Sequence, residues 1–125
     1  MAFHLGIDVG SISINTVVMD DERSVVENHY DYCRGKPFHA LKEILQQLLG
    51  QSYSFDCIAV TGTGGDLVAK LIGGGFVNEI VAQSSSVGYL YPQAKTIIEM
   101  GGEDSKLILM GPDGSEGHSR LSDFS

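Results

Sequence analysis

Apolar and polar residues alternate along the first part of the chain. Every second residue is apolar over Phe3–Val9, and a similar alternation resumes over Ile12–Val18, after Gly10 and Ser11. A period of two is typical of a strand with one buried face, and a tight Gly-Ser turn joins two such strands. The sequence therefore predicts an N-terminal β-hairpin.

Helical and extended patterns follow this hairpin in turn. The spacing of apolar residues favours a helix that starts at Pro37 and stops at Gly50. Phe55–Thr61 is almost wholly apolar, which favours a strand that is buried on both faces and parallel to an earlier strand. The predicted elements are strands at 24–32, 55–61, 76–79, 96–100 and 106–110, and helices at 37–49, 66–72 and 80–91. The second helix is expected to bury Leu67, Val68, Leu71 and Ile72.

Composition and charge narrow the class of protein. At 125 residues and 42% hydrophobic content, the chain is one small packed domain, or one domain and a piece of another. No apolar run is long enough to span a membrane, so we expect a cytoplasmic protein without a membrane partner. The net charge of −8 argues against nucleic-acid binding, which needs basic patches. A phosphate ligand would then need backbone amides and a bridging cation more than Lys or Arg.

Two acidic residues each precede a glycine turn between predicted strands. The segment Gly6–Ser11 has a counterpart in Ile98–Glu103, where Glu99 stands in the place of Asp8. A charge at the end of a buried strand costs free energy unless it is paired or holds a metal ion. Two such hairpins facing each other would offer two carboxylates to a divalent cation and backbone N–H groups to a polyphosphate. Phosphoryl transfer mainly needs such positioning and charge neutralisation.

Other polar and reactive residues have simpler interpretations. The glycine-rich segment Thr61–Gly65 favours a strand-to-helix turn, with a direct phosphate contact as the less favoured alternative. The spacing of Cys33 and Cys57 fits no metal pattern within this chain. Because Cys57 lies in an apolar run, we expect it to be an inert core thiol.

These motifs together resemble those of one family. The segment Thr96–Lys106 closely resembles the second phosphate motif of the CoA-substrate-specific enzyme activases, the BadF/BadG/BcrA/BcrD ATPase family. Gly6–Ser11 resembles the first phosphate motif of this family, and Ala59–Gly64 and Asn78–Ile80 also fit. Members of the family activate 2-hydroxyacyl-CoA dehydratases or serve as ATPase subunits of benzoyl-CoA reductase.

The resemblance implies a fold and an activity. The fold would be an α/β domain of the actin-like ATPase (ribonuclease H-like) type, with a mixed five-stranded sheet and helices on both faces. Residues 1–93 would form this domain, and residues 94–125 the first hairpin of a second such domain. The family hydrolyses ATP with Mg²⁺ and couples this to electron transfer from a [4Fe–4S] cluster into a dehydratase or reductase. It works as a homodimer with the cluster between the subunits.

The resemblance also assigns roles to individual residues. Asp8 would orient Mg²⁺ or its waters, and Glu99 would lie near the metal or the attacking water. Catalysis is assigned to Glu99 and Asp104, the metal to Asp8 and Glu99, and phosphate contacts to Gly10, Ser11, Ser13, Gly101, Gly102 and Glu103.

The chain departs from the family pattern in three places. Asn15 stands where family members often have Lys, and Glu99 where they usually have Asp. The chain ends at Ser125, before the positions of the cluster cysteines, so we expect a truncated fragment that binds ATP weakly or not at all and carries no cluster. Two alternatives stay open: a sugar or acid kinase of the same superfamily, and a non-enzymatic interaction module that has lost hydrolysis.

Overall fold

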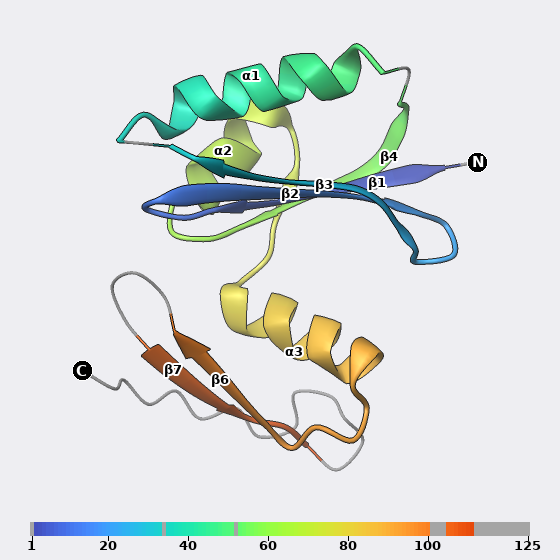
Figure 1. The fold of residues 1–125 in the computed structure, drawn as a ribbon, viewed down its shortest axis with the longest axis vertical. Helices are drawn as coiled ribbons and strands as arrows, with labels where there is room; N and C mark the ends of the chain where they lie inside the picture. Colours follow the sequence, from blue (N-terminus) through green and yellow to red (C-terminus); the bar gives the residue numbers. More distant parts are fainter. Residues whose placement is uncertain (1, 34, 52, 101–104, 112–125) are drawn as a thin grey trace. The chain divides into compact units, whose positions relative to one another are not determined.

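The chain forms two compact units. The computed structural model describes residues 2–33, 35–51, 53–100 and 105–111 (Figure 1). The first unit comprises Met1–Val77 and the second Asn78–Ser125. The predicted domain division at residue 93 stays a prediction.

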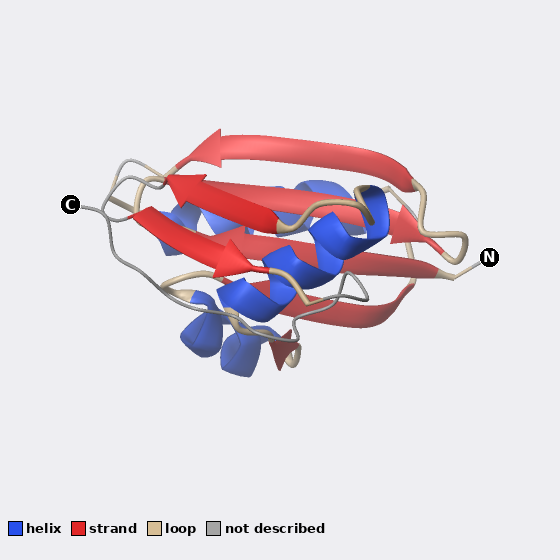
Figure 2. Cartoon of the chain, turned by 90° about the horizontal axis from the view of Figure 1, so that it is seen from below, coloured by secondary structure: helices blue, strands red, loops and turns tan. Residues whose placement is uncertain are grey.

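A mixed five-stranded sheet forms the first unit. Its strands are β1 (Phe3–Val9), β2 (Ser13–Asp20), β3 (Val25–Tyr32), β4 (Phe55–Thr61) and β5 (Gly75–Phe76). Their order is β3-β2-β1-β4-β5, and they lie side by side in Figure 2. The three N-terminal strands are antiparallel, whereas β4 runs parallel to β1 and to β5. The predicted hairpin, the parallel β4 and the mixed five-stranded sheet are confirmed.

Two helices pack on one face of this sheet. Helix α1 (Pro37–Leu49) starts with proline in its first turn and ends before Gly50, as predicted, and α2 (Gly65–Ile72) ends at the left-handed Gly73. Both helices lie on the same side of the strands in Figure 1. They share one core with the sheet, made of Leu5, Ile7, Val9, Ile14, Val18, Cys33, Leu41, Ile44, Leu48, Val60, Val68 and Ala69. Cover of the opposite face by a helix stays a prediction.

Two predictions about burial are wrong. Helix α2 buries Val68 as predicted, and Ile72 packs partly buried against the core, whereas Leu67 and Leu71, also predicted to be buried, are 53% and 67% exposed. In β4 only Val60 is buried, so this strand is not buried on both faces. Both errors have one cause: α1 and α2 cover a single face of the sheet, and short apolar runs do not show which face meets the core.

The second unit contains one helix and one hairpin. Helix α3 (Glu79–Leu90) begins at Asn78, whose side-chain oxygen accepts a hydrogen bond from the Ile80 N–H at 2.8 Å. Strands β6 (Thr96–Met100) and β7 (Ser105–Leu109) pair antiparallel. Across the described part of the chain, every helix is too short or too polar to cross a bilayer.

A polar clamp joins β3 to the connection between α1 and β4. The Glu27 carboxylate accepts hydrogen bonds from the Tyr53 hydroxyl at 2.7 Å, from His29 Nε2 at 2.6 Å and from Gln51 Nε2 at 3.4 Å. These bonds, that of Tyr53 first, lower the pKa of Glu27, and the same Tyr53–Glu27 bond raises the pKa of Tyr53. The clamp therefore fixes the edge strand β3 to a segment distant in sequence.

Candidate functional site

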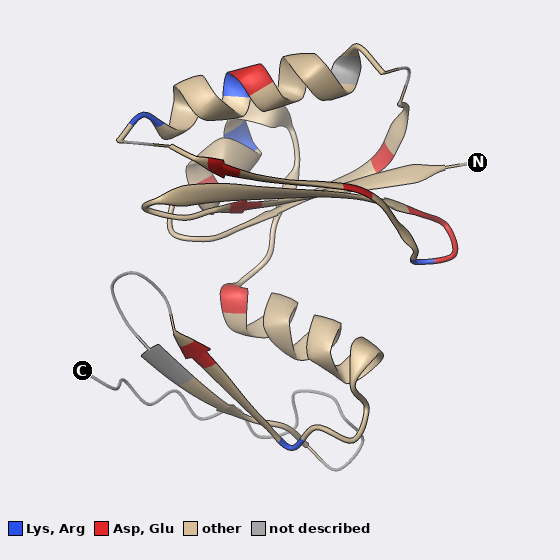
Figure 3. Cartoon of the chain, viewed as in Figure 1, with Lys and Arg blue, Asp and Glu red and all other residues tan. Residues whose placement is uncertain are grey.

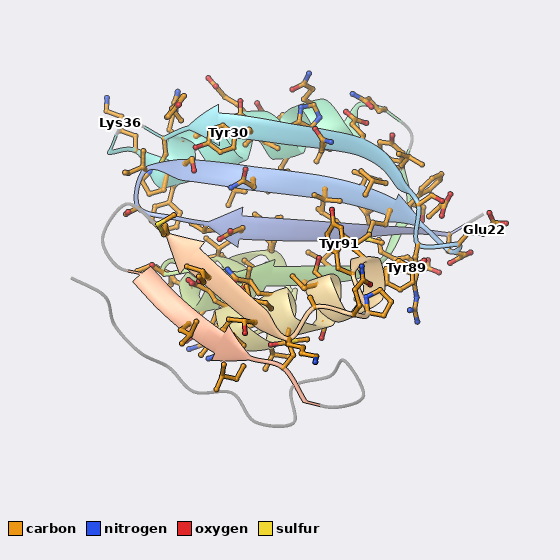
Figure 4. The ribbon with its side chains drawn as sticks, turned by 60° about the horizontal axis from the view of Figure 1, so that its bottom comes forward. Glu22, Tyr30, Lys36, Tyr89 and Tyr91 are labelled. Carbon is orange, nitrogen blue, oxygen red and sulfur yellow. The ribbon has the colours of Figure 1, made fainter. Side chains whose placement is uncertain are left out.

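The candidate site is a polar row at the carboxyl end of β1. Asp8 is in register with Asn15 on β2 and with Thr61 on β4, and Asn15 is in register with Tyr30 on β3. Residues opposite one another on neighbouring strands share a face of the sheet. Because Ile7 points into the core, this row lies on the face that α1 and α2 leave uncovered. Figure 4 shows Tyr30 on β3 within that face.

Asp8 is exposed, which corrects the expectation of a charge in a buried position. The two buried neighbours of Asp8, Ile7 and Val9, point to the opposite face because side chains alternate along a strand. A carboxylate in this position keeps much of its hydration. An exposed carboxylate of this kind can contact a hydrated cation.

The turn between β4 and α2 packs directly against the end of β1. Gly62 has a φ of +99°, and a Cβ atom built there would lie 2.3 Å from the Val9 carbonyl oxygen and 2.6 Å from Asp8 Oδ1. The Gly64 N–H donates to the Val9 carbonyl at 3.2 Å. Nearby, Thr61 Oγ1 is buried and has no hydrogen-bond partner among the described residues. A residue without a side chain is thus required where this turn meets Asp8.

This turn contributes more to the site than its sequence pattern predicts. The run Thr61–Gly65 favours a strand-to-helix connection, yet Gly62 contacts the region of the predicted metal-binding carboxylate. The available signal was the run Thr61–Gly65, three glycines at the end of a strand predicted to be parallel to an earlier one. Parallel strands bring their carboxyl ends to the same edge of a sheet.

The loop between β1 and β2 has a defined backbone conformation. The Gly10 N–H donates to the Ser13 carbonyl at 2.9 Å, which closes the loop. Ser11 and Ile12 are exposed, and Ser13 is half-buried. A shallow hollow of about 410 Å³ beside the loop is lined by Ser11, Ile12, Tyr32 and Gly35. The predicted phosphate-binding residues Gly10, Ser11 and Ser13 therefore lie together, next to Asp8 in the chain.

The hairpin that carries this loop has no strongly basic side chain. Residues 3–20 contain no Lys or Arg, and Figure 3 shows β1 and β2 without basic segments. Asn15 is opposite Asp8 and cannot neutralise it. Backbone N–H groups with one exposed carboxylate suit a phosphate that arrives with a hydrated Mg²⁺, which takes one or two carboxylates and keeps several waters. The donor set of this chain therefore fits Mg²⁺ with a phosphate.

The second predicted motif lies in the second unit. Glu99 is half-buried on β6, opposite Lys106 on β7. The other predicted residues of this motif, Gly101, Gly102, Glu103 and Asp104, lie outside the described residues. The approach of Glu99 to Asp8 would join the two units, and it stays a prediction.

The two cysteines differ in environment. Cys33 is buried, and its N–H donates to the Ile12 carbonyl near the carboxyl end of β1. Cys57 is exposed, so the expectation of a core thiol is wrong for this residue. It lies in register with His4, near the amino end of β1. About six residues of strand, roughly 20 Å, separate these ends. The two thiols therefore do not fit a shared iron–sulfur cluster.

Comparison with known proteins places the chain in a family. The sequence profile of the BadF/BadG/BcrA/BcrD ATPase family matches residues 5–125. The uncharacterized protein MJ0004 of Methanocaldococcus jannaschii is 29% identical over 119 residues, which cover 95% of this chain and 48% of that protein. The chain thus spans about half the length of this relative.

Two solved structures share the fold. The Acidaminococcus fermentans (R)-2-hydroxyglutaryl-CoA dehydratase component A matches with a TM-score of 0.78 and 22% identity, over 98% of this chain and 48% of that one. The activator of the 2-hydroxyisocaproyl-CoA dehydratase from Clostridium difficile, with bound ADPNP, gives 0.74 and 20%, over 97% and 46%. These likenesses confirm the predicted actin-like ATPase fold. Because the family profile extends over nearly the whole sequence, the chain belongs to the BadF/BadG/BcrA/BcrD ATPase family.

Proposed function

We propose that this chain is the N-terminal part of an ATP-hydrolysing activator that drives electron transfer to a CoA-ester-processing dehydratase or reductase. Membership of an ATPase family supports the binding of a nucleotide by this chain. Two structures with the same fold, a dehydratase component and a dehydratase activator, support the class of partner. The activator was solved with bound ADPNP, which further supports ATP as the ligand.

One observation carries the proposal. An exposed carboxylate, Asp8, lies beside a loop of small residues at the carboxyl end of a central strand. Gly62 packs closely on this strand end: a Cβ atom there would lie 2.3 Å from the Val9 carbonyl oxygen and 2.6 Å from Asp8 Oδ1. A carboxylate next to a backbone loop is the arrangement that phosphate transfer with a divalent cation needs.

The roles of the residues follow from this arrangement. Asp8 orients Mg²⁺ or its waters, and Gly10, Ser11 and Ser13 hold phosphate oxygens. A Mg²⁺ ion held at Asp8 would supply charge neutralisation for phosphoryl transfer. The second motif completes the site: Glu99 and Asp104 act near the metal and the attacking water, and Gly101, Gly102 and Glu103 contact phosphate.

The proposed electron transfer requires cysteine ligands for an iron–sulfur cluster in the full-length protein. The activity that we propose uses a homodimer with one [4Fe–4S] cluster between its subunits. Cys33 and Cys57 lie at opposite ends of the sheet, so the ligands of such a cluster would be other cysteines. No step of the proposed activity passes through the two thiols of this chain.

Titration of the full-length protein with Mg-ATP tests the proposal. The variants are Asp8→Asn and, as a matched control, Asp56→Asn. Asp56 is an exposed carboxylate at the start of β4, whereas the candidate site lies at the end of this strand. The control therefore removes the same charge at a position distant from the site. We expect Asp8→Asn to weaken binding at least about ten-fold, and Asp56→Asn to leave it unchanged.

Other results of this titration would contradict the proposal or favour one of the alternative functions. Equal affinities for Asp8→Asn and the wild type would contradict the assigned metal site. Absence of binding in the wild type would favour a non-enzymatic interaction module. Mg-ATP binding with phosphorylation of a sugar or acid, and without activation of a dehydratase component, would favour a kinase.

A further inference from the structure

A buried thiol lies against the carbonyl side of the loop between β1 and β2. Cys33 is 3% exposed, and its Sγ lies 3.7 Å from the Ser11 carbonyl oxygen and 4.0 Å from that of Gly10. The Cys33 N–H donates to the Ile12 carbonyl at 2.9 Å, and the Cys33 carbonyl accepts from the Lys36 N–H at 2.7 Å. Lys36 immediately precedes α1, and Figure 4 shows it in the segment after β3. Cys33 thus connects three consecutive loop carbonyls to the start of a helix.

The orientation of these carbonyls fixes the orientation of the loop's N–H groups. The C=O and N–H groups of a trans peptide point in opposite directions, and no described peptide is cis. Because the carbonyls of Gly10 and Ser11 turn toward Cys33, the N–H groups of Ser11 and Ile12 turn away from it. Successive N–H groups on one side of a turn form a concave site for an anion.

We propose that Cys33 is a positioning residue for phosphate binding. Its thiol and its N–H hold the loop carbonyls on one side, so that the N–H groups of Ser11 and Ile12 face the phosphates of the nucleotide. This inference rests on the proposed function and adds to it a residue outside both phosphate motifs. A preset loop matters here because residues 3–20 carry no Lys or Arg that could adapt to the phosphate.

Substitution separates the thiol's hydrogen bonding from its volume. Cys33→Ala removes the donor and part of the volume, Cys33→Val fills at least the same volume without a donor, and Cys33→Ser keeps a donor. We expect the Ala and Val variants of the full-length protein to bind Mg-ATP about two- to ten-fold more weakly, and the Ser variant to stay close to wild type. The loss should appear in KM for ATP and leave kcat nearly unchanged, because loop contacts serve ground and transition states alike.

Cys57→Ala is the matched control for these variants. This exposed thiol lies at the other end of the sheet, so its removal should change neither affinity nor KM. Wild-type affinity in Cys33→Val would overturn the inference, because volume alone would then suffice. Wild-type affinity in Cys33→Ala would overturn it as well.

A second measurement uses the unaltered protein and is independent of variant folding. A thiol reagent labels Cys33 only when the loop opens, so saturating Mg-ATP should slow its labelling at least about three-fold. Cys57 provides the internal control, with an unchanged rate by mass spectrometry of the two peptides. Unchanged labelling of Cys33 would overturn this inference alone, whereas a wild type that does not bind Mg-ATP would overturn the proposed function first.

Discussion

The close packing of Gly62 leads to the sharpest prediction about stability. Gly62→Ala adds a Cβ atom that would lie 2.3 Å from the Val9 carbonyl oxygen and 2.7 Å from its carbonyl carbon. Backbone atoms cannot rotate away, so the strand end must shift, at a cost of about 1–3 kcal/mol. A side chain at a φ of +99° adds about 1–2 kcal/mol. We expect the substitution to lower the free energy of unfolding by about 2–5 kcal/mol.

Gly73→Ala is the matched control. Gly73 also has a positive φ, +75°, but a Cβ atom there would meet nothing within 4 Å. The control should therefore lose only the conformational part, about 1–2 kcal/mol. Urea unfolding followed by circular dichroism or tyrosine fluorescence measures both values, since the chain has five tyrosines and no tryptophan. Equal losses for the two variants would refute the close approach of Gly62 to β1.

Two further predictions concern buried or clamped polar groups in the first unit. Thr16 is fully buried and its Oγ1 has no hydrogen-bond partner among the described residues, so Thr16→Val should raise the free energy of unfolding by about 1 kcal/mol in urea denaturation. A lower stability in this variant would mean that the hydroxyl has a partner. Hydrogen bonds lower the pKa of Glu27, so its stabilising effect is complete above the ordinary pKa of a glutamate and is lost as the pH falls through the lowered value. Glu27→Gln should flatten the fall of the melting temperature between about pH 5 and pH 3, and an unchanged slope would contradict a stabilising clamp.

Local patterns predicted the elements of the first unit well. Pro37 marked the start of α1 and Phe55–Thr61 matched β4, because terminal residues and apolar runs act over a few positions. Local patterns did not predict which side chains are buried. Leu67 and Leu71 are exposed because burial depends on the face that a distant part of the sheet presents to the helix. Cys57 is exposed for a related reason, since α1 and α2 cover only one face of the sheet.

Local patterns likewise predicted only the part of the candidate site whose residues are neighbours in the sequence. Asp8, Gly10 and Ser11 are neighbours in the sequence, so their grouping at one strand end needed only the prediction of a hairpin. The approach of Gly62 to Asp8 depends on the register of two parallel strands that are far apart in the chain. The contact of Cys33 with the loop depends on the end of β3. Neither contact has a periodic signal in the sequence.

These two contacts together explain how an acidic chain can receive an acidic ligand. The end of β1 and the loop after it are held from both sides, by the β4–α2 turn at Gly62 and by Cys33. Asn15 lies opposite Asp8, and the hairpin that carries the loop, residues 3–20, has no Lys or Arg that could follow the phosphate and neutralise it. Attraction must then come from fixed backbone dipoles and from the cation that accompanies the nucleotide, and fixed dipoles are effective only when they do not reorganise on binding. Rigidity supplied by Gly62 and Cys33 would in this way offset the lack of Lys and Arg in residues 3–20.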